Sequence, residues 1–507
     1  DYASTFPLMY LNYQLAQDID GNTVMITGDG GVQNNVSDLY EIKLGYDLND
    51  DLTALFTLGY ENIKKQGGYD ARNYLTAPDG STFWGNGKDI TANQDGFDFT
   101  PDKRRFGASS FARTLNERET LMYGLNLSGK ISKDWDIDST VSYFDAYKDR
   151  AITPNLSLED PGFDNKGTIK DTKMWWATYD IKLATQNLFG NENLGFMSGY
   201  QFNNSFLNVT QHKSDNILGA SKDSQKDDVG GSTELHSFFA QSDLNFLKDF
   251  NVLLGARLDY WQAKQGHVHK FGFGAVTQNF DDRNETRISP KFSLSYAPNN
   301  FSVKYSFTKA YRFPIAEELF KSSSDTSIKS IADPSLKPET GFFHDLTARY
   351  ELDDGFASLS LFHNKIHDEI MRTTQIIGAQ SVSTFLAIDE TEAIGVELVY
   401  QQDYIFDTPV GVAFNATWLD KEIMRNDGNI ALVGKEWVRT PKFRVNATAT
   451  YHITDNWDSS LNINYRSRQF QNEDNSDTVT GVFGSSSDYT LVNLKSSYSF
   501  EFKKDVM

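Results

Sequence analysis

The feature that most constrains the fold is an alternation of apolar and polar side chains that recurs along most of the chain. It is clearest at 301–308, where apolar Phe301, Val303, Tyr305 and Phe307 alternate with polar Ser302, Lys304, Ser306 and Thr308. After a long loop, the same alternation returns at 345–352. Because successive side chains of a strand point to opposite faces, a period of two predicts strands with one apolar and one polar face.

The connections between these segments are of two kinds. Short turns are expected at 49–51, 132–134, 248–250, 298–300, 353–355 and 454–456, and long polar loops separate the hairpins that these turns close. In an antiparallel meander this places all short turns at one end and all long loops at the other, as in outer-membrane barrels. Trp135 and Trp457 directly follow short turns, where a membrane interface favours tryptophan.

The composition agrees with a membrane barrel. Only 39% of the 507 residues are hydrophobic, and no run of about 18 apolar residues predicts a membrane helix. A membrane strand needs only about 10 residues, of which every second one is apolar. A soluble β-sandwich or propeller would alternate equally well, but the one-sided loops and expected strand lengths of about 10 to 15 residues favour the membrane. We therefore predict an all-β, antiparallel transmembrane barrel over residues 38–507, and interpret residues 1–37 as a loop or partial strand.

Charge and motifs exclude several functions. The net charge of -21 argues against nucleic acid as a partner. The absence of Cys removes disulfides, thiolate chemistry and zinc ribbons. The sequence contains no nucleophile elbow, phosphate loop or His-Glu-x-x-His motif, so we predict no enzymatic activity. No charged-then-apolar leader follows Asp1, so we expect that a signal peptide was removed or was never included.

A two-part motif in the long loop after residue 308 gives a family resemblance. Its halves are Lys-Ala-Tyr-Arg-Phe-Pro-Ile-Ala-Glu-Glu-Leu-Phe at 309–320 and Asp-Pro-Ser-Leu-Lys-Pro-Glu at 333–339. This pair resembles the barrel signature of TonB-dependent outer-membrane receptors. Weaker support comes from 393–397, 439–441 and 489–500. The residues that match the signature are Tyr311, Arg312, Phe313, Pro314, Glu317, Leu336, Lys337, Pro338 and Glu339.

The resemblance implies a 22-stranded barrel closed by a plug domain, in the outer membrane of a Gram-negative bacterium. We count about 17 strands and find neither a plug nor a TonB box, so we expect the barrel portion of a longer receptor. The implied function is active import of a scarce bulky nutrient, most often a ferric siderophore. Energy would come from the TonB–ExbB–ExbD complex through an N-terminal region outside this chain.

Several further expectations follow from the resemblance. The barrel should be monomeric and surrounded by outer-membrane lipid and lipopolysaccharide. No cofactor is expected, with ferric iron present only as part of the transported chelate. Cobalamin, haem and oligosaccharide remain alternative cargoes, although haem receptors of this family carry a His between the two motif halves and this chain has none there. A passive porin or a surface-adhesion barrel is the alternative of another class.

An anionic iron chelate needs aromatic faces and fixed cations, and the loops supply both. The candidates in the first long loop, about 65–116, are Tyr69, Arg72, Tyr74, Trp84, Lys103, Arg104 and Arg105. The run at 103–105 could equally be a solvated cluster or bind lipopolysaccharide phosphates.

Two further candidates lie later in the chain. His267 and His269, at i and i+2 in a loop, should point the same way and could suit a metal, although one pair is half a site. Arg312 is either a ligand contact or, as we favour, a wall residue facing a plug. Lys43, Arg257, Arg349 and Arg444 should face the lumen.

Overall fold

A computed structural model describes residues 4–5, 16–17, 23–24, 32–67, 75–76, 82–83, 91–92, 114–156, 158, 162–271, 275–324, 328–377, 380–478 and 486–500. The first-loop candidates Tyr69, Arg72, Tyr74, Trp84, Lys103, Arg104 and Arg105 lie outside these residues.

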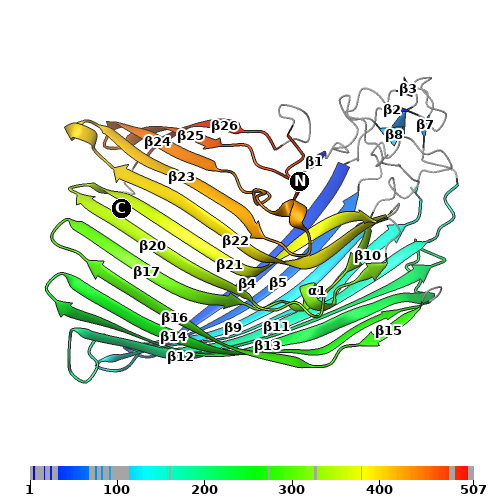
Figure 1. Ribbon diagram of the computed structural model, residues 1–507, viewed down its shortest axis with the longest axis horizontal. Helices are drawn as coiled ribbons and strands as arrows, with labels where there is room; N and C mark the ends of the chain where they lie inside the picture. The colour runs from blue at the N-terminus through cyan, green and yellow to red at the C-terminus, as the bar shows by residue number, and fades with distance from the viewer. Residues whose placement is uncertain are drawn as a thin grey trace, which may run out of the picture.

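Within the described residues, 17 strands of ten or more residues form one antiparallel series (Figure 1). They are β4 (Val32–Asn49), β5 (Leu52–Gly67), β9 (Leu115–Ser132), β10 (Trp135–Pro154), β11 (Gly167–Thr185), β12 (Leu194–Ser214), β13 (Ser224–Leu247), β14 (Phe250–Lys270), β16 (Arg283–Tyr296), β17 (Phe301–Arg312), β20 (Glu339–Leu352), β21 (Gly355–Ile377), β22 (Gln380–Gln402), β23 (Val410–Arg425), β24 (Phe443–Thr454), β25 (Trp457–Arg466) and β26 (Tyr489–Tyr498). Each strand from β4 to β25 pairs with the next one named here. The predicted all-β antiparallel fold and strand count are confirmed.

The remaining described elements are small. They are the helix α1 (Ala316–Phe320), the single-turn helices η2 (Ile405–Asp407) and η3 (Ile430–Leu432), and the short strands β1 (Ser4–Thr5), β2 (Ala16–Gln17), β3 (Thr23–Val24), β6 (Leu75–Thr76), β7 (Thr82–Phe83), β8 (Thr91–Ala92), β15 (Val276–Asn279), β18 (Ser323–Ser324) and β19 (Ile328–Ile331). In the described parts of the chain, no helix has the length and apolar character needed to cross a membrane.

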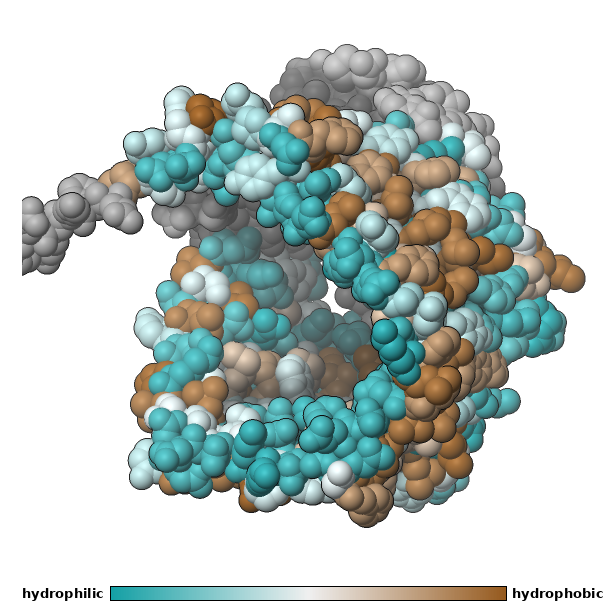
Figure 2. All heavy atoms as spheres, turned by 90° about the vertical axis from the view of Figure 1, so that its left-hand side faces the viewer, coloured by the Kyte–Doolittle hydropathy of each residue, from teal (hydrophilic) through white to brown (hydrophobic). Residues whose placement is uncertain are grey.

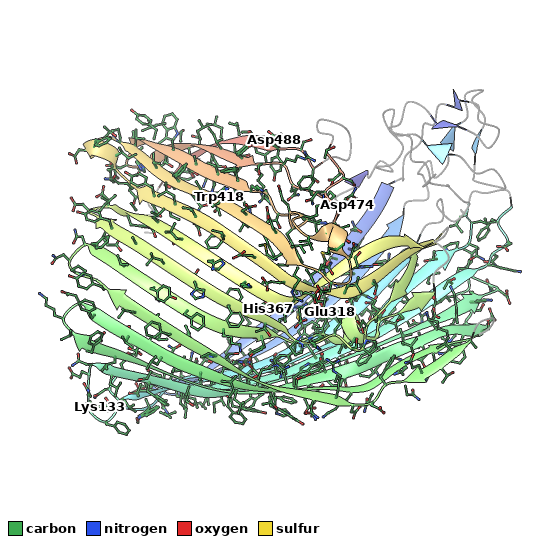
Figure 3. The ribbon with its side chains drawn as sticks, in the orientation of Figure 1. Lys133, Glu318, His367, Trp418, Asp474 and Asp488 are labelled. Carbon is green, nitrogen blue, oxygen red and sulfur yellow. The ribbon has the colours of Figure 1, made fainter. Side chains whose placement is uncertain are left out.

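The short turns fall where the sequence predicts them. β9 ends at Ser132 and β10 begins at Trp135, and the same agreement holds at the other five turns. Lys133, in one of these turns, lies at the left-hand end of the molecule in Figure 3, opposite the end that carries β15 in Figure 1. The predicted separation of short turns from long loops is therefore confirmed.

Two boundaries differ from the prediction. β4 begins at Val32, six residues before the expected start at 38, because the polar segment 32–37 continues the ladder with β5. β13 has 24 residues, well beyond the expected 10 to 15. A tilted strand crosses the apolar band in about 10 residues. The additional residues of β13 therefore extend the hairpin beyond the membrane, where segments with polar side chains form the same backbone ladder.

The two faces of the sheet have different chemistry, as period-two alternation requires. On β14, Leu254 and Leu258 are exposed on the outer face, whereas Asp259 on the opposite face is 3% exposed. There, the Arg257 guanidinium donates to Asp259 Oδ1 at 2.7 Å, which confirms that Arg257 faces the interior. Figure 2 shows hydrophilic residues around a hollow interior and hydrophobic residues over the outer surface. The exposed apolar face is the one that lipid would cover.

Candidate functional site

The signature loop folds back onto the inner face of the sheet. Its helix α1 lies between β17 and β20 in the sequence, yet it packs against β12, β13 and β14. Leu319 and Phe320 of α1 are buried in a cluster with Leu207 of β12, Val229 of β13 and Trp261 of β14. Complete burial of side chains of this size contributes about 1.5–3 kcal/mol each. The loop is therefore held on the wall of the barrel by an apolar core of its own.

Phe320 packs against two glycines on neighbouring strands. A Cβ atom at Gly231 of β13 would lie 2.4 Å from the Phe320 ring, and one at Gly266 of β14 would lie 2.2 Å from it. Both positions belong to an irregularity in the β13–β14 register, between the pairs Gly230–His267 and Ser232–Lys264. The glycines are thus needed for close approach of the ring to the sheet.

Arg312 forms the polar centre of the loop. Its guanidinium contacts Glu318 Oε1 at 3.0 Å and Glu339 Oε1 at 2.5 Å. The carboxylates also accept backbone N–H groups, Glu318 from Ile315 at 3.0 Å and Glu339 from Ile370 at 2.7 Å. The side chains of Glu318 and Glu339 are 10% and 12% exposed, so one cation serves two buried acids. In Figure 3, Glu318 lies near the middle of the view, far from Lys133.

The loop prediction for Arg312 needs correction. Arg312 is the last residue of strand β17, and Glu339 is the first residue of β20. The two residues are register partners across this strand pair. The pairing therefore continues four residues into the segment predicted as loop, because the Arg312–Glu339 ion pair closes the ladder.

A second arginine fixes the other half of the motif. Arg283 of β16 donates to the carbonyl oxygen of Pro334 at 2.7 Å and also to that of Leu336. Its guanidinium lies 5.3 Å from the ring centroid of Trp261, and Trp261 in turn stacks on Phe313 with centroids 5.8 Å apart. These contacts join the first and second motif halves to the same wall strands.

The other signature residues also lie within this assembly. Pro314, Leu336 and Pro338 are buried, and Lys337 is exposed. The carboxylate of Glu317 pairs with Lys321 at 2.8 Å, and Lys309 Nζ lies 5.2 Å from the Tyr311 ring centroid. The structure thus brings the two halves of the motif together as one packed unit.

His267 and His269 lie in strand β14 and not in a loop as predicted, because the β13–β14 hairpin extends further than expected. Their rings are 5.2 Å apart between centroids, which confirms that they point the same way. His267 Nε2 lies 3.4 Å from Asp228 Oδ1, and His269 Nε2 lies 3.0 Å from Asn279 Oδ1. No group of three or more potential metal ligands occurs among the described residues.

A second set of packed side chains, Glu369, Lys421 and Trp437, lies on the extended β21–β23 hairpins. The Lys421 ammonium of β23 contacts Glu369 at 2.6 Å and lies 4.0 Å from the Trp437 ring centroid. Both charged side chains are largely buried, 16% exposed for Lys421 and 12% for Glu369. Trp437 also packs on the apolar cluster around Ile423, so the segment after β23 is tied to the sheet.

The described part of the β25–β26 connection at 467–478 packs on the same region. The Asn475 side chain accepts from Glu436 N at 2.7 Å and donates to Glu436 O at 3.0 Å. Thr373 of β21 donates to Glu473 at 2.6 Å. Partial burial favours the neutral form of Asp474, but hydrogen bonds from Ser476 outweigh it and lower the pKa of the carboxyl. The segment after β23 and residues 473–475 therefore pack together on strands β21 and β23.

Sequence reasoning missed Arg283, Trp261, Glu369 and Lys421. All four lie in strands, and nothing in the adjacent sequence distinguishes them from other wall residues. A basic or aromatic residue on the polar face is a weak signal that becomes specific only when the loop that packs on it is known.

This architecture defines a class of protein. A meander of long strands with a lipid-compatible outer face, a polar interior and one-sided loops is an outer-membrane β-barrel. The family described as TonB dependent receptor-like, beta-barrel, matches residues 45–506. The chain belongs to this family, and it is a protein of the Gram-negative outer membrane.

Individual relatives agree with this assignment. An iron-regulated outer membrane virulence protein of Vibrio cholerae is 24% identical over 247 residues, which cover 46% of this chain and 34% of the relative. The chain thus matches about one third of the length of that curated relative.

Solved structures share the fold. The ferric yersiniabactin uptake receptor FyuA from Yersinia pestis has a TM-score of 0.57 at 12% identity, covering 96% of this chain and 71% of that one. The ferripyoverdine receptor of Pseudomonas aeruginosa has a TM-score of 0.58 at 13% identity, covering 96% of this chain and 65% of that one. The copper transporter OprC has a TM-score of 0.64 at 12% identity, covering 98% of this chain and 75% of that one.

Proposed function

We propose that this chain is the barrel of an active importer that takes an iron chelate, in particular a ferric siderophore, across the outer membrane with energy supplied through TonB. The observation that carries the proposal is the family match over 45–506 together with the iron-regulated relative. The folds shared with receptors for ferric yersiniabactin and ferripyoverdine add support.

The signature loop plays a structural part in this proposal. With Arg312 and Arg283 both engaged by groups of the chain, the loop stiffens the wall beside the lumen. Ligand capture then falls to other groups at the loop end, including the first-loop aromatic and basic residues proposed above. We propose no catalytic role and no resident cofactor.

The test is uptake of radioactive ferric iron by cells that express the receptor, with a panel of siderophores that includes catecholates, hydroxamates and mixed chelates. We expect at least one chelate to accumulate well above the receptor-free control and to lose this accumulation when TonB is deleted or the proton gradient is collapsed. Accumulation that persists without TonB would contradict the proposal and favour the passive pore.

A planar-bilayer measurement separates the two classes independently. The full-length energy-coupled receptor, with the plug that the family resemblance implies, is expected to show no steady conductance, whereas a porin would show stable open channels.

A further inference from the structure

Two arginines oppose each other on the inner face of strands β24 and β25. Arg444 of β24 and Arg466 of β25 are register partners. The outer face of the same strands carries exposed apolar side chains, among them Phe443, Tyr451 and Leu461. Because successive side chains of a strand alternate between its two faces, both guanidinium groups project into the lumen. This agrees with the lumen-facing position that the sequence predicts for Arg444.

The pairing of two cations sets this position apart from the rest of the sheet. In the ladders that the structure describes, Arg444 and Arg466 are the one register pair in which two lysine or arginine residues oppose each other. Elsewhere a cation opposes an acid or an uncharged residue, as Arg312 opposes Glu339. Like charges placed directly opposite each other destabilise a sheet. The pair therefore lowers the stability of the fold unless an anion lies between the two groups.

The described part of the chain does not supply that anion. Neither guanidinium has an ion pair or a side-chain hydrogen bond with another described residue. Glu397, on β22 two strands from Arg444, accepts a hydrogen bond from an asparagine at 2.9 Å, and Asp458, lower on β25, is paired with a histidine at 2.7 Å. Asp488 precedes the residue opposite Arg466 and makes no ion pair with it. Both arginines are therefore available to a group from outside these residues.

The wall around the two arginines is fixed by hydrogen bonds and is uncharged. Directly above them, Ser467 N donates to Phe443 O at 2.9 Å, and the Ser467 hydroxyl accepts from Phe443 N at 3.0 Å. Directly below them, Asn446 and Asn464 are register partners. The amide of Asn462 donates to Asn446 at 2.7 Å and accepts from Asn464. The two guanidinium groups thus lie above a set of mutually bonded amides.

The arginines lie near the outer end of the membrane-spanning lumen. Arg444 is ten residues from Thr454, the last residue of β24 at the short-turn end. At a rise of about 3.3 Å per residue and a tilt of about 40°, this corresponds to roughly 25 Å, the height of the apolar band. β24 and β25 lie at the upper edge of the view in Figure 1, away from α1. The pair is therefore separate from the signature loop.

We propose that Arg444 and Arg466 form a carboxylate-binding subsite of the lumen. A guanidinium donates to both oxygens of a carboxylate in a planar fork, and a carboxylate between the two groups removes their mutual repulsion. The carboxylate belongs either to the imported chelate or to an acidic side chain of another part of the full-length receptor. As a subsite for cargo, it rests on the proposed import function and adds that the chelate carries a free carboxylate.

The test uses purified full-length receptor in detergent and the double variant Arg444→Gln with Arg466→Gln. The first measurement is equilibrium binding of two probes, ferric citrate, which is rich in carboxylates, and ferrichrome, a neutral ferric hydroxamate. The second measurement is the melting temperature without any probe. Together they separate the two sources of the carboxylate.

A carboxylate from the cargo predicts that the affinity for ferric citrate falls by more than about tenfold, because charge-assisted hydrogen bonds are lost. Ferrichrome binding should not change, and the melting temperature should stay the same or rise, since the repulsion between the arginines is removed. A carboxylate from the receptor itself predicts the opposite pattern, with a lower melting temperature and unchanged ferric citrate binding.

The matched control combines Lys43→Gln with Arg349→Gln and removes the same charge. Lys43 and Arg349 each pair with an acid two residues away on their own strand, at 3.1 Å and 2.5 Å. We expect this control to keep both the binding and the melting temperature of the unaltered receptor. Arg444→Lys with Arg466→Lys keeps the charge but loses the planar fork, so it should recover only part of whichever property the double glutamine variant loses.

A double glutamine variant that matches the control in both ferric citrate binding and melting temperature would overturn the proposal. Neither measurement involves TonB or uptake. Accumulation that persists without TonB would therefore remove the proposed import function and leave the result for the subsite unaffected.

Discussion

Replacement of Arg312 by methionine is expected to lower the free energy of unfolding of the barrel by about 2–4 kcal/mol. The substitution leaves Glu318 and Glu339, only 10% and 12% exposed, without their shared cation. Removal of one partner from a buried ion pair costs about 3–5 kcal/mol, and the 43% exposure of the Arg312 side chain reduces this value. Arg312→Lys should recover only part of the loss, because an ammonium group cannot reproduce the fork of a guanidinium.

The measurement is denaturant unfolding of the receptor folded in detergent, with tryptophan fluorescence as the readout. Arg349→Met is the matched control, since the side chains of Arg349 and its partner Glu351 are 38% and 51% exposed. Such exposed pairs contribute little to stability, because solvent screens the two charges. Similar losses for Arg312→Met and Arg349→Met would show that the two acids do not depend on Arg312.

Gly266→Ala is expected to destabilise the protein by about 1–3 kcal/mol through overpacking. The new methyl group would lie 2.2 Å from the Phe320 ring, so the ring must leave its position on the sheet. The displaced loop should then become sensitive to protease within 313–338, which limited proteolysis with mass spectrometry can locate.

Gly45→Ala serves as the control for this experiment. It is the same substitution in a strand, but a Cβ at Gly45 would have no neighbour within 4 Å. The double variant Gly266→Ala with Phe320→Leu should recover part of the stability, because the smaller side chain leaves room for the methyl group. If Gly266→Ala leaves stability and protease resistance unchanged, the close packing of Phe320 on this strand is contradicted.

The barrel was predictable because its signals are local and repeated. Period-two alternation determines which side chains share a face, as at Phe301 and Val303, and Asn- and Asp-containing turns mark the hairpins. The motif at 309–320 and 333–339 indicated the family without any knowledge of its contacts. These features can be recognised from the sequence because each depends on a few adjacent residues.

The packing of the motif could not be predicted in the same way. Arg283 is 51 residues from Pro334, whose carbonyl it binds, and Phe320 reaches two glycines on strands that precede it by more than 50 residues. The ends of the strands were also misjudged, since the ladder continues past the membrane wherever polar residues can pair. His267 and His269 are in a strand for this reason.

The central structural claim is that the signature loop forms part of the inner wall, and cysteine labelling tests it most directly. The chain has no native Cys, so Leu319→Cys and Ile315→Cys each introduce a single thiol. Leu319 is 0% exposed and Ile315 is 50% exposed. In intact outer membranes, a water-soluble maleimide should label Ile315→Cys within minutes and Leu319→Cys only after denaturation. Equal labelling of the two thiols in the folded receptor would contradict the account.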